Sequence, residues 1–298
     1  PLALIGIGVA AALRLLPRRQ AKEATVESRR SFLGTLAAIT PPLLATGGVA
    51  YGLQRINEFR VREFEFRVPG LPPALDGLTI AHVSDLHTGK FTTEESVESI
   101  VSTVNGLQAD LVLFTGDLID LSMADLPLAL DILSRLQPQS RLFLCEGNHD
   151  LIDDGRKFRR GVREAGFKLL LNEGSTVEIR GERVQVLGVK WARGEARRQR
   201  EMEKVRALQE PDSFPILLAH HPHCFDAAGE IPLTLAGHTH GGLLMINERV
   251  GPGPLLYRYW SGHYERGGRS VVVSNGVGNW FPLRTSAPAE IGHLKLRV

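Results

Sequence analysis

The stretch Leu233–Gly242 reads LTLAGHTHGG, and the prediction of the fold starts from it. A short apolar run followed by glycine is typical of a buried strand that opens into a loop. His238 and His240 lie two residues apart on that loop, and the flanking glycines allow both rings to face one point. Imidazole is the side chain that most often ligates metals. Taken alone, the stretch is compatible with half of a metal site or with a polar turn that contains two incidental histidines. The residues at the ends of the other strands distinguish these two interpretations.

Length and composition set broad limits. The 298 residues are 43% hydrophobic and 23% charged, as in an ordinary globular protein with one large domain or two. A net charge of +2 argues against a nucleic acid partner, which usually requires a basic patch. Cys145 and Cys224 cannot form a disulfide framework, and Cys145 lies in an apolar run that indicates a core position.

Residues 1–58 are predicted to form a membrane and export-signal region. Residues 1–13 are apolar, residues 14–30 carry six basic and two acidic side chains, and residues 31–54 carry no charge. A bilayer core is spanned by about 20 apolar residues, so 31–54 is predicted to be a transmembrane helix. Because positive loops stay on the cytoplasmic side, the catalytic domain is expected on the extracytoplasmic face of a bacterial cell membrane.

The border of this apolar segment carries a second signal. Ser28–Leu33 reads SRRSFL and resembles the twin-arginine export signal, which would make the export machinery a partner. The alternative is an ordinary basic flank. A cleavage site near Ala50 is weak, so retention on the membrane is expected.

Residues 59–298 are predicted to form one α/β catalytic domain. Residues 55–73 are read as a connector with a first edge strand. The other predicted strands are Leu78–Ser84, Asp110–Thr115, Arg141–Glu146, Val177–Arg180, Val184–Trp191, Phe214–Ala219, Leu233–Ala236, Ser270–Ser274 and Ile291–Val298. The predicted helices are Thr92–Leu107, Asp125–Leu136, Asp154–Ala165 and Ala192–Gln209. Continuous apolar strands between helices indicate a sheet covered on both faces, with ligands at the carboxyl ends of its strands.

Polar clusters follow five of these strands. They are Asp85/His87, Gly116–Asp120, Gly147–Asp150, His220 and Gly237–His240. In this order they resemble the calcineurin-like metallophosphoesterase superfamily, whose pattern is D-x-H, G-D-x-x-D, G-N-H-[DE], a lone His and G-H-x-H. Leu71–Gly89 and the export signal are similar to the membrane-associated YkuE/YaeI-type branch. Leu243 and Asn275 depart from the Gln and Arg frequent in that branch, which puts the substrate in doubt.

The resemblance implies a four-layer α-β-β-α sandwich of two mixed sheets with two metal ions about 4 Å apart. It assigns Asp85, His87 and His240 to the first ion. It assigns Asn148, His220 and His238 to the second ion, with Asp117 bridging the two. The ions would lower the pKa of a bridging water, giving a hydroxide that attacks phosphorus. Nitrogen and oxygen ligands without thiolate suit Mn, Fe or Zn.

The resemblance also implies a general acid, His149, whose tautomer Asp120 would fix. The alternative for Asp120 is a helix N-cap. His221 and His223 are interpreted as polar residues of a loop or helix start, and His82 as a structural histidine within a strand. His263 is considered only as a substrate contact.

The sequence is compatible with three hypotheses about function. The leading hypothesis is a metal-dependent phosphoester hydrolase, a phosphodiesterase or phosphatase, that acts on a phospholipid or lipid-linked phosphate at the membrane surface. The alternatives are a phosphodiesterase for a soluble substrate such as a cyclic nucleotide, and a non-catalytic binding module on the same fold. The complete ligand set argues against the third.

Overall fold

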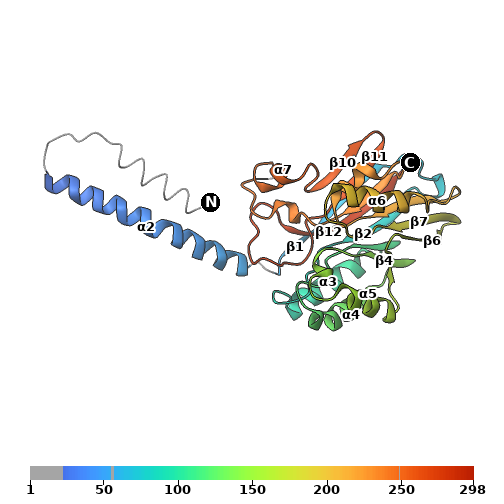
Figure 1. The fold of residues 1–298 in the computed structure, drawn as a ribbon, viewed down its shortest axis with the longest axis horizontal. Helices are drawn as coiled ribbons and strands as arrows, with labels where there is room; N and C mark the ends of the chain where they lie inside the picture. Colours follow the sequence, from blue (N-terminus) through green and yellow to red (C-terminus); the bar gives the residue numbers. More distant parts are fainter. Residues whose placement is uncertain (1–22, 55–56, 248) are drawn as a thin grey trace. The chain divides into compact units, whose positions relative to one another are not determined.

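The computed structural model describes residues 23–54, 57–247 and 249–298. The chain divides into two compact units, Pro1–Arg55 and Ile56–Val298 (Figure 1). In the first unit the described element is helix α2, Glu23–Gln54, which contains Pro41 and Pro42. The predicted apolar segment 1–13 and the start of the basic loop lie outside the described residues.

The transmembrane segment predicted over 31–54 is not supported. Among the described residues, no helix combines the length and the apolar character needed to cross a membrane. Threonines, glycines and the two prolines interrupt the apolar side chains of α2.

The second unit contains two mixed sheets. The order of strands in the first sheet is β1 (Phe59–Arg67), β12 (Ala289–Arg297), β2 (Thr79–Val83), β3 (Leu111–Thr115), β4 (Arg141–Cys145) and β5 (Lys168–Leu169). Strands β2 to β5 are parallel, and β12 is antiparallel to β2. The predicted first strand is confirmed at the sheet edge, where β1 pairs with β12 alone.

The second sheet has the order β10 (Gly262–Arg266), β11 (Arg269–Val273), β9 (Leu233–Ala236), β8 (Phe214–Leu218), β7 (Glu182–Gly188) and β6 (Glu173–Ile179). Its four central strands are parallel, and the hairpins β6–β7 and β10–β11 add antiparallel edges. The predicted strands on either side of Gly181 are therefore confirmed, and they pair as the hairpin β6–β7.

Helices cover the outer face of each sheet. On the first sheet they are α3 (Glu94–Gly106), α4 (Leu126–Ser134) and α5 (Gly155–Glu164), whose apolar side chains share one core with β2 to β4. On the second sheet they are α6 (Glu195–Arg206) and the short helix η4 (Pro222–Ala227). A further core lies between the sheets, where Ile80 and Leu113 of one meet Ile216 and Leu235 of the other.

The helix boundaries have local causes. Thr93 caps α3, because its hydroxyl accepts the Ser96 N–H while the Ser96 hydroxyl accepts the Thr93 N–H. Asp154 caps α5 by accepting two backbone N–H groups. The elements that were not predicted include helix α7 (Pro252–Leu256), strand β10 and the two-residue strand β5.

Candidate metal centre

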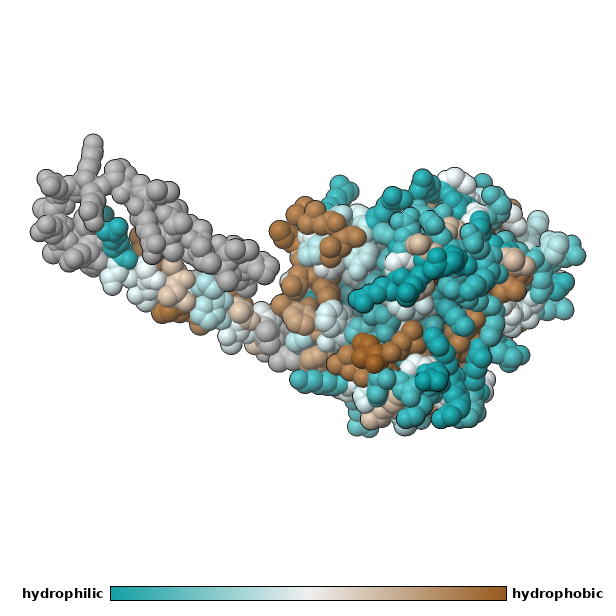
Figure 2. All heavy atoms as spheres, viewed as in Figure 1, coloured by the Kyte–Doolittle hydropathy of each residue, from teal (hydrophilic) through white to brown (hydrophobic). Residues whose placement is uncertain are grey.

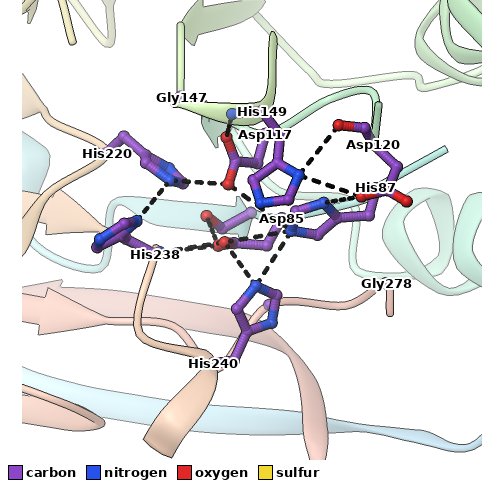
Figure 3. A network of polar contacts seen from close by, with 12 residues as sticks. Asp85, His87, Asp117, Asp120, Gly147, His149, His220, His238, His240 and Gly278 are labelled. Carbon is purple, nitrogen blue, oxygen red and sulfur yellow. Dashed lines mark hydrogen bonds and ion pairs between the residues drawn. The ribbon is translucent and has the colours of Figure 1, made fainter. Parts of the chain in front are cut away.

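The predicted ligands lie together at one edge of the two sheets. Asp85 follows β2, Asp117 follows β3 and Asn148 follows β4, three neighbouring parallel strands. His220 follows β8 and His238 follows β9, a parallel pair in the second sheet. The carboxyl ends of all five strands therefore meet at one place, as the sequence predicts (Figure 3).

The backbone is strained where it presents these side chains. Five predicted ligands adopt positive φ: Asp85 (51°), His87 (46°), Asp117 (55°), His238 (73°) and His240 (49°). Such angles are uncommon for residues other than glycine and persist only where the surroundings hold them. Two glycines permit close approach: a Cβ on Gly147 would lie 2.1 Å from Asp117 Oδ1, and one on Gly237 would lie 2.0 Å from Ser84 Oγ.

Asp85, His87 and His240 form the first group of donors. His87 Nε2 lies 3.1 Å from His240 Nε2, and Asp85 Oδ1 lies 3.2 Å from the same His240 nitrogen. All three side chains are buried. Three donor atoms from two loops thus converge on one point, which is a geometry for holding a cation.

Asp117, His220 and His238 form the second group. His220 Nε2 lies 3.0 Å from Asp117 Oδ2 and 3.3 Å from His238 Nδ1. His220 donates its Nδ1–H to the Thr115 carbonyl at 2.7 Å, which leaves Nε2 directed at the group.

Asp117 lies between the two groups. Its Oδ2 is 3.0 Å from His220 Nε2 in the second group and 3.7 Å from His87 Nε2 in the first. Asn148 lines the same cavity as Asp117 and His238, and its Oδ1 is buried without a hydrogen-bond partner within the described structure. Because buried polar atoms are nearly always paired, this carbonyl oxygen is expected to contact a bound ligand.

These residues fit a pair of metal ions. Carboxylate and amide oxygens together with imidazole nitrogens suit transition metals such as Mn, Fe or Zn. Ring nitrogens about 3 Å apart cannot both donate to each other, whereas both can bind a shared cation. The described residues contain a third group, Asp120, His87 and His149, which shares His87 with the first.

The buried carboxylates of the site raise the pKa of two of its histidines. Burial lowers the pKa of His220, but the charge and hydrogen bond of Asp117 outweigh it and raise the pKa to about 9. For His87 burial is likewise outweighed, here by hydrogen bonds to Asp120 and Asp85, and the pKa is about 9. Burial and the neighbouring His220 lower the pKa of His238 to about 3. The site therefore retains cationic groups beside its buried carboxylates.

Asp150 anchors the loops beneath the ligands. Its carboxylate accepts the N–H groups of Gly147 and three consecutive residues, Asp117, Leu118 and Ile119, at 2.8–3.1 Å. Burial and the Asp117 charge raise its pKa to about 7 despite these bonds. The sequence pattern includes this aspartate, but its positioning role was not predicted.

His149 and Asp120 lie beside each other next to the donor groups. His149 Nδ1 is 3.1 Å from Asp120 Oδ1, and the His149 N–H donates to Asp117 Oδ1 at 2.7 Å. Ser122, not Asp120, caps the following helical turn, so the N-cap interpretation of Asp120 is wrong. Asp120 thus contacts the His149 ring, as the predicted pair requires. The catalytic role of the pair stays a prediction.

The remaining histidines have structural contacts. His82 is buried within β2, with Nε2 2.9 Å from the Thr115 hydroxyl. His221 accepts the His223 N–H and caps η4, as predicted for a helix start. His263 stacks on Phe66 at 4.1 Å and does not line the cavity at the donor groups, so the structure does not support a substrate contact there.

A cavity of about 490 Å³ opens beside the donors. The polar part of its lining consists of Asp117, Asn148, His149, His238, Thr239 and His240. The rest of the lining, called here the apolar wall, consists of Gly242, Leu243, Leu244, Pro252, Leu256, Tyr257, Trp280 and Phe281. The cavity thus joins a polar, cation-binding wall to an apolar wall.

Sequence reasoning missed two neighbours of the ligands. Arg284 Nη2 lies 3.0 Å from His240 Nδ1, while its other N–H groups donate to the carbonyls of Asn275 and Gly278. Burial lowers the pKa of Arg284 to about 10, so it stays charged. Trp191 packs its ring 4.9 Å from that of His238. Neither residue belongs to a motif, and no local pattern indicates them.

Known proteins are similar to the part of the chain that carries these residues. The sequence model described as calcineurin-like phosphoesterase matches residues 78–242. The chain is 30% identical over 285 residues to the uncharacterized metallophosphoesterase YkuE of Bacillus subtilis, covering 89% of this chain and 96% of that protein. It is 27% identical over 281 residues to the phosphodiesterase YaeI of Escherichia coli, covering 90% and 99%. It is 30% identical over 301 residues to a transmembrane protein with a metallophosphoesterase domain from Danio rerio, covering 95% and 67%.

Proposed function

The chain belongs to the calcineurin-like phosphoesterase family, and from this membership and its site we propose that it is a metal-dependent hydrolase of phosphoesters. The observation that carries the proposal is the pair of donor groups with Asp117 between them. Asp85, His87 and His240 would hold one ion, and Asn148, His220 and His238 the other. When bound, such a pair supplies Lewis acidity toward phosphate oxygens and a water of lowered pKa.

The protein's own groups complete the reaction. His149 lines the cavity, where it can donate a proton to the departing oxygen of a bound ester. Asp120, at 3.1 Å, orients the His149 ring. The aromatic side chains Trp280 and Phe281 also line the cavity, and the Trp280 ring lies 6.0 Å from that of His149, where it would exclude water from a bound ester.

The test is cleavage of bis(p-nitrophenyl) phosphate by the full chain loaded with Mn²⁺. The Asp117→Asn variant is expected to lose at least about 100-fold in kcat/KM, since removing even residues behind the ligands costs about that much. The Asp131→Asn variant, on the exposed face of α4, is the matched control and should act as wild type. Full activity of Asp117→Asn, or of wild type after chelation, would refute the mechanism.

Within this class we infer a substrate that joins a phosphate to an apolar group, such as a phospholipid or lipid-linked phosphate. Support comes from the apolar wall, because Leu243, Leu244 and Leu256 face the same cavity as the donor groups. The soluble alternative, a cyclic nucleotide, would use Tyr257 and Trp280 to stack its base. Turnover of lipid in mixed micelles is expected to exceed turnover of a cyclic nucleotide, and the reverse order would favour the alternative.

We further propose that the protein is exported and retained at the outer face of a bacterial cell membrane. The basis is the basic segment 14–30 with the twin-arginine-like Ser28–Leu33. Changing Arg29 and Arg30 together to lysine is expected to keep the protein in the cytoplasm, as measured by fractionation. Unchanged export of that variant would exclude the twin-arginine route.

A further inference from the structure

Large apolar side chains are exposed around the mouth of the cavity. The group, called here the apolar rim, consists of Leu244, Ile246, Val250, Leu255, Leu256, Trp280 and Phe281. Leu255 is 85% exposed and Ile246 is 78% exposed, among the highest values for apolar residues of the described structure. In Figure 2 hydrophobic residues gather around α7, the helix that carries Leu255 and Leu256.

The backbone beneath the rim is held in place. The Ile246 N–H donates to the Val250 carbonyl at 2.8 Å, and the Ser286 hydroxyl donates to the Ile246 carbonyl at 3.1 Å. Met245, between exposed Leu244 and Ile246, is buried. The loop therefore has an inner side chain that anchors it and outer side chains that face solvent.

The rim is continuous with the site. Leu244, Leu256, Trp280 and Phe281 are members of the rim that also line the cavity, whereas Ile246, Val250 and Leu255 extend it outward. A protein partner that covered the rim would close the cavity and exclude substrate. A lipid surface would cover the same side chains and also deliver an ester into the cavity.

We propose that the apolar rim inserts into the interface of a lipid bilayer and places the cavity mouth against the phosphate headgroups. The choice of a bilayer as occupant rests on the proposed function, in which the substrate carries a phosphate and an apolar group. Aliphatic side chains with a tryptophan at the margin suit the boundary between acyl chains and headgroups. Exposed Arg249, beside Val250, is placed for anionic headgroups.

The first experiment measures insertion at one position of the full chain. Both native cysteines are free and buried, so an environment-sensitive fluorophore can be attached to the Leu255→Cys variant. Leu128→Cys, on α4, is the matched control at an exposed leucine. With vesicles of phosphatidylcholine and phosphatidylglycerol at 3:1, brominated lipid is expected to quench the label at 255 at least threefold more than at 128. Equal quenching at both positions would overturn the proposal.

The label also separates docking from catalysis. The Asp117→Asn background, which is expected to be inactive, should give the same quenching at 255. Strong quenching with no cleavage of any lipid by the wild type would leave the docking surface standing and refute the lipid substrate. Quenching that disappears in Asp117→Asn would contradict a surface that acts independently of the site.

The second experiment changes the rim outside the cavity. The double variant Ile246→Glu/Leu255→Glu is expected to cleave the soluble aryl diester as wild type does, since neither side chain lines the cavity. Its cleavage of lipid in the same vesicles should fall at least tenfold, with Leu128→Glu as the control. Unchanged cleavage of vesicle lipid by the double variant would refute membrane docking through the rim.

Discussion

His149 and Asp120 lie together beside the donor groups, and His149 lines the cavity. His149 Nδ1 faces Asp120 Oδ1 at 3.1 Å, and its ring packs edge-on against His87 at 4.5 Å between centroids. The ring is thereby fixed on two sides without belonging to either of the predicted ion sites. A residue with these neighbours can act on the leaving group without holding metal.

The identity of the leaving group provides a test of this role. A nitrophenolate departs without a proton, whereas an alkoxide requires one. The His149→Gln variant is therefore expected to lose about 100- to 10,000-fold in kcat on an alkyl phosphodiester and much less on the nitrophenyl ester. Kinetics on both substrates and metal content of the purified protein are the measurements. Equal losses on both, or loss of bound metal, would show that His149 acts otherwise.

At the level of elements, strand β2 carries a buried histidine through the core of the first sheet. Burial lowers the pKa of His82 to about 4, although the charge of Asp85 acts in the opposite direction. A histidine with a lowered native pKa contributes stability that is complete above pH 6.5 and is lost as the pH falls toward 4. The shift corresponds to about 3 kcal/mol at most.

Unfolding of the metal-free protein should show this contribution. The His82→Gln variant is expected to lose less unfolding free energy than wild type between pH 6.5 and 4, measured by urea denaturation with EDTA present. Thr115→Val, which removes the hydroxyl beside His82 Nε2, is the control and should lower stability at each pH without changing the slope. If the unfolding free energy of His82→Gln changed with pH as steeply as that of wild type, a neutral buried His82 would be contradicted.

The elements that could be predicted from sequence are those with a repeated physical pattern. Buried parallel strands such as β3 read as continuous apolar runs, and glycine with a polar residue marks where they end. Helix α7 spans five residues, too short for periodicity, and β10 is a half-exposed edge strand with mixed side chains. Neither element therefore has a sequence pattern that predicts it.

The site could be predicted through its motifs but not through its supports. Each donor directly follows the end of a strand, so the order of the motifs along the chain is enough to predict the donors. Arg284 reaches His240 across 44 residues, and Leu256 of α7 joins the cavity only after folding. Contacts of this kind depend on how β9 and the last loops pack, which no local pattern records.

At the scale of the whole molecule, the donor groups connect the two sheets. Asp85, His87 and Asp117 follow strands of the first sheet, whereas His220, His238 and His240 follow strands of the second. The first and second groups each combine residues of both sheets. Bound metal would consequently bridge the sandwich at its open edge and would be bound by the folded state alone.

Metal removal should therefore destabilise the catalytic unit as a whole. With free Mn²⁺ at 100 times its dissociation constant, binding at one site stabilises the fold by about 2.7 kcal/mol. For a unit of this size that corresponds to a melting temperature higher by about 5–10 °C, measured by calorimetry with and without chelator. His238→Ala, which removes one donor of the second group, should show a smaller shift, whereas the exposed Asp131→Asn should keep it. If chelation leaves the wild-type melting temperature unchanged, the donor groups do not bind metal across the sheets.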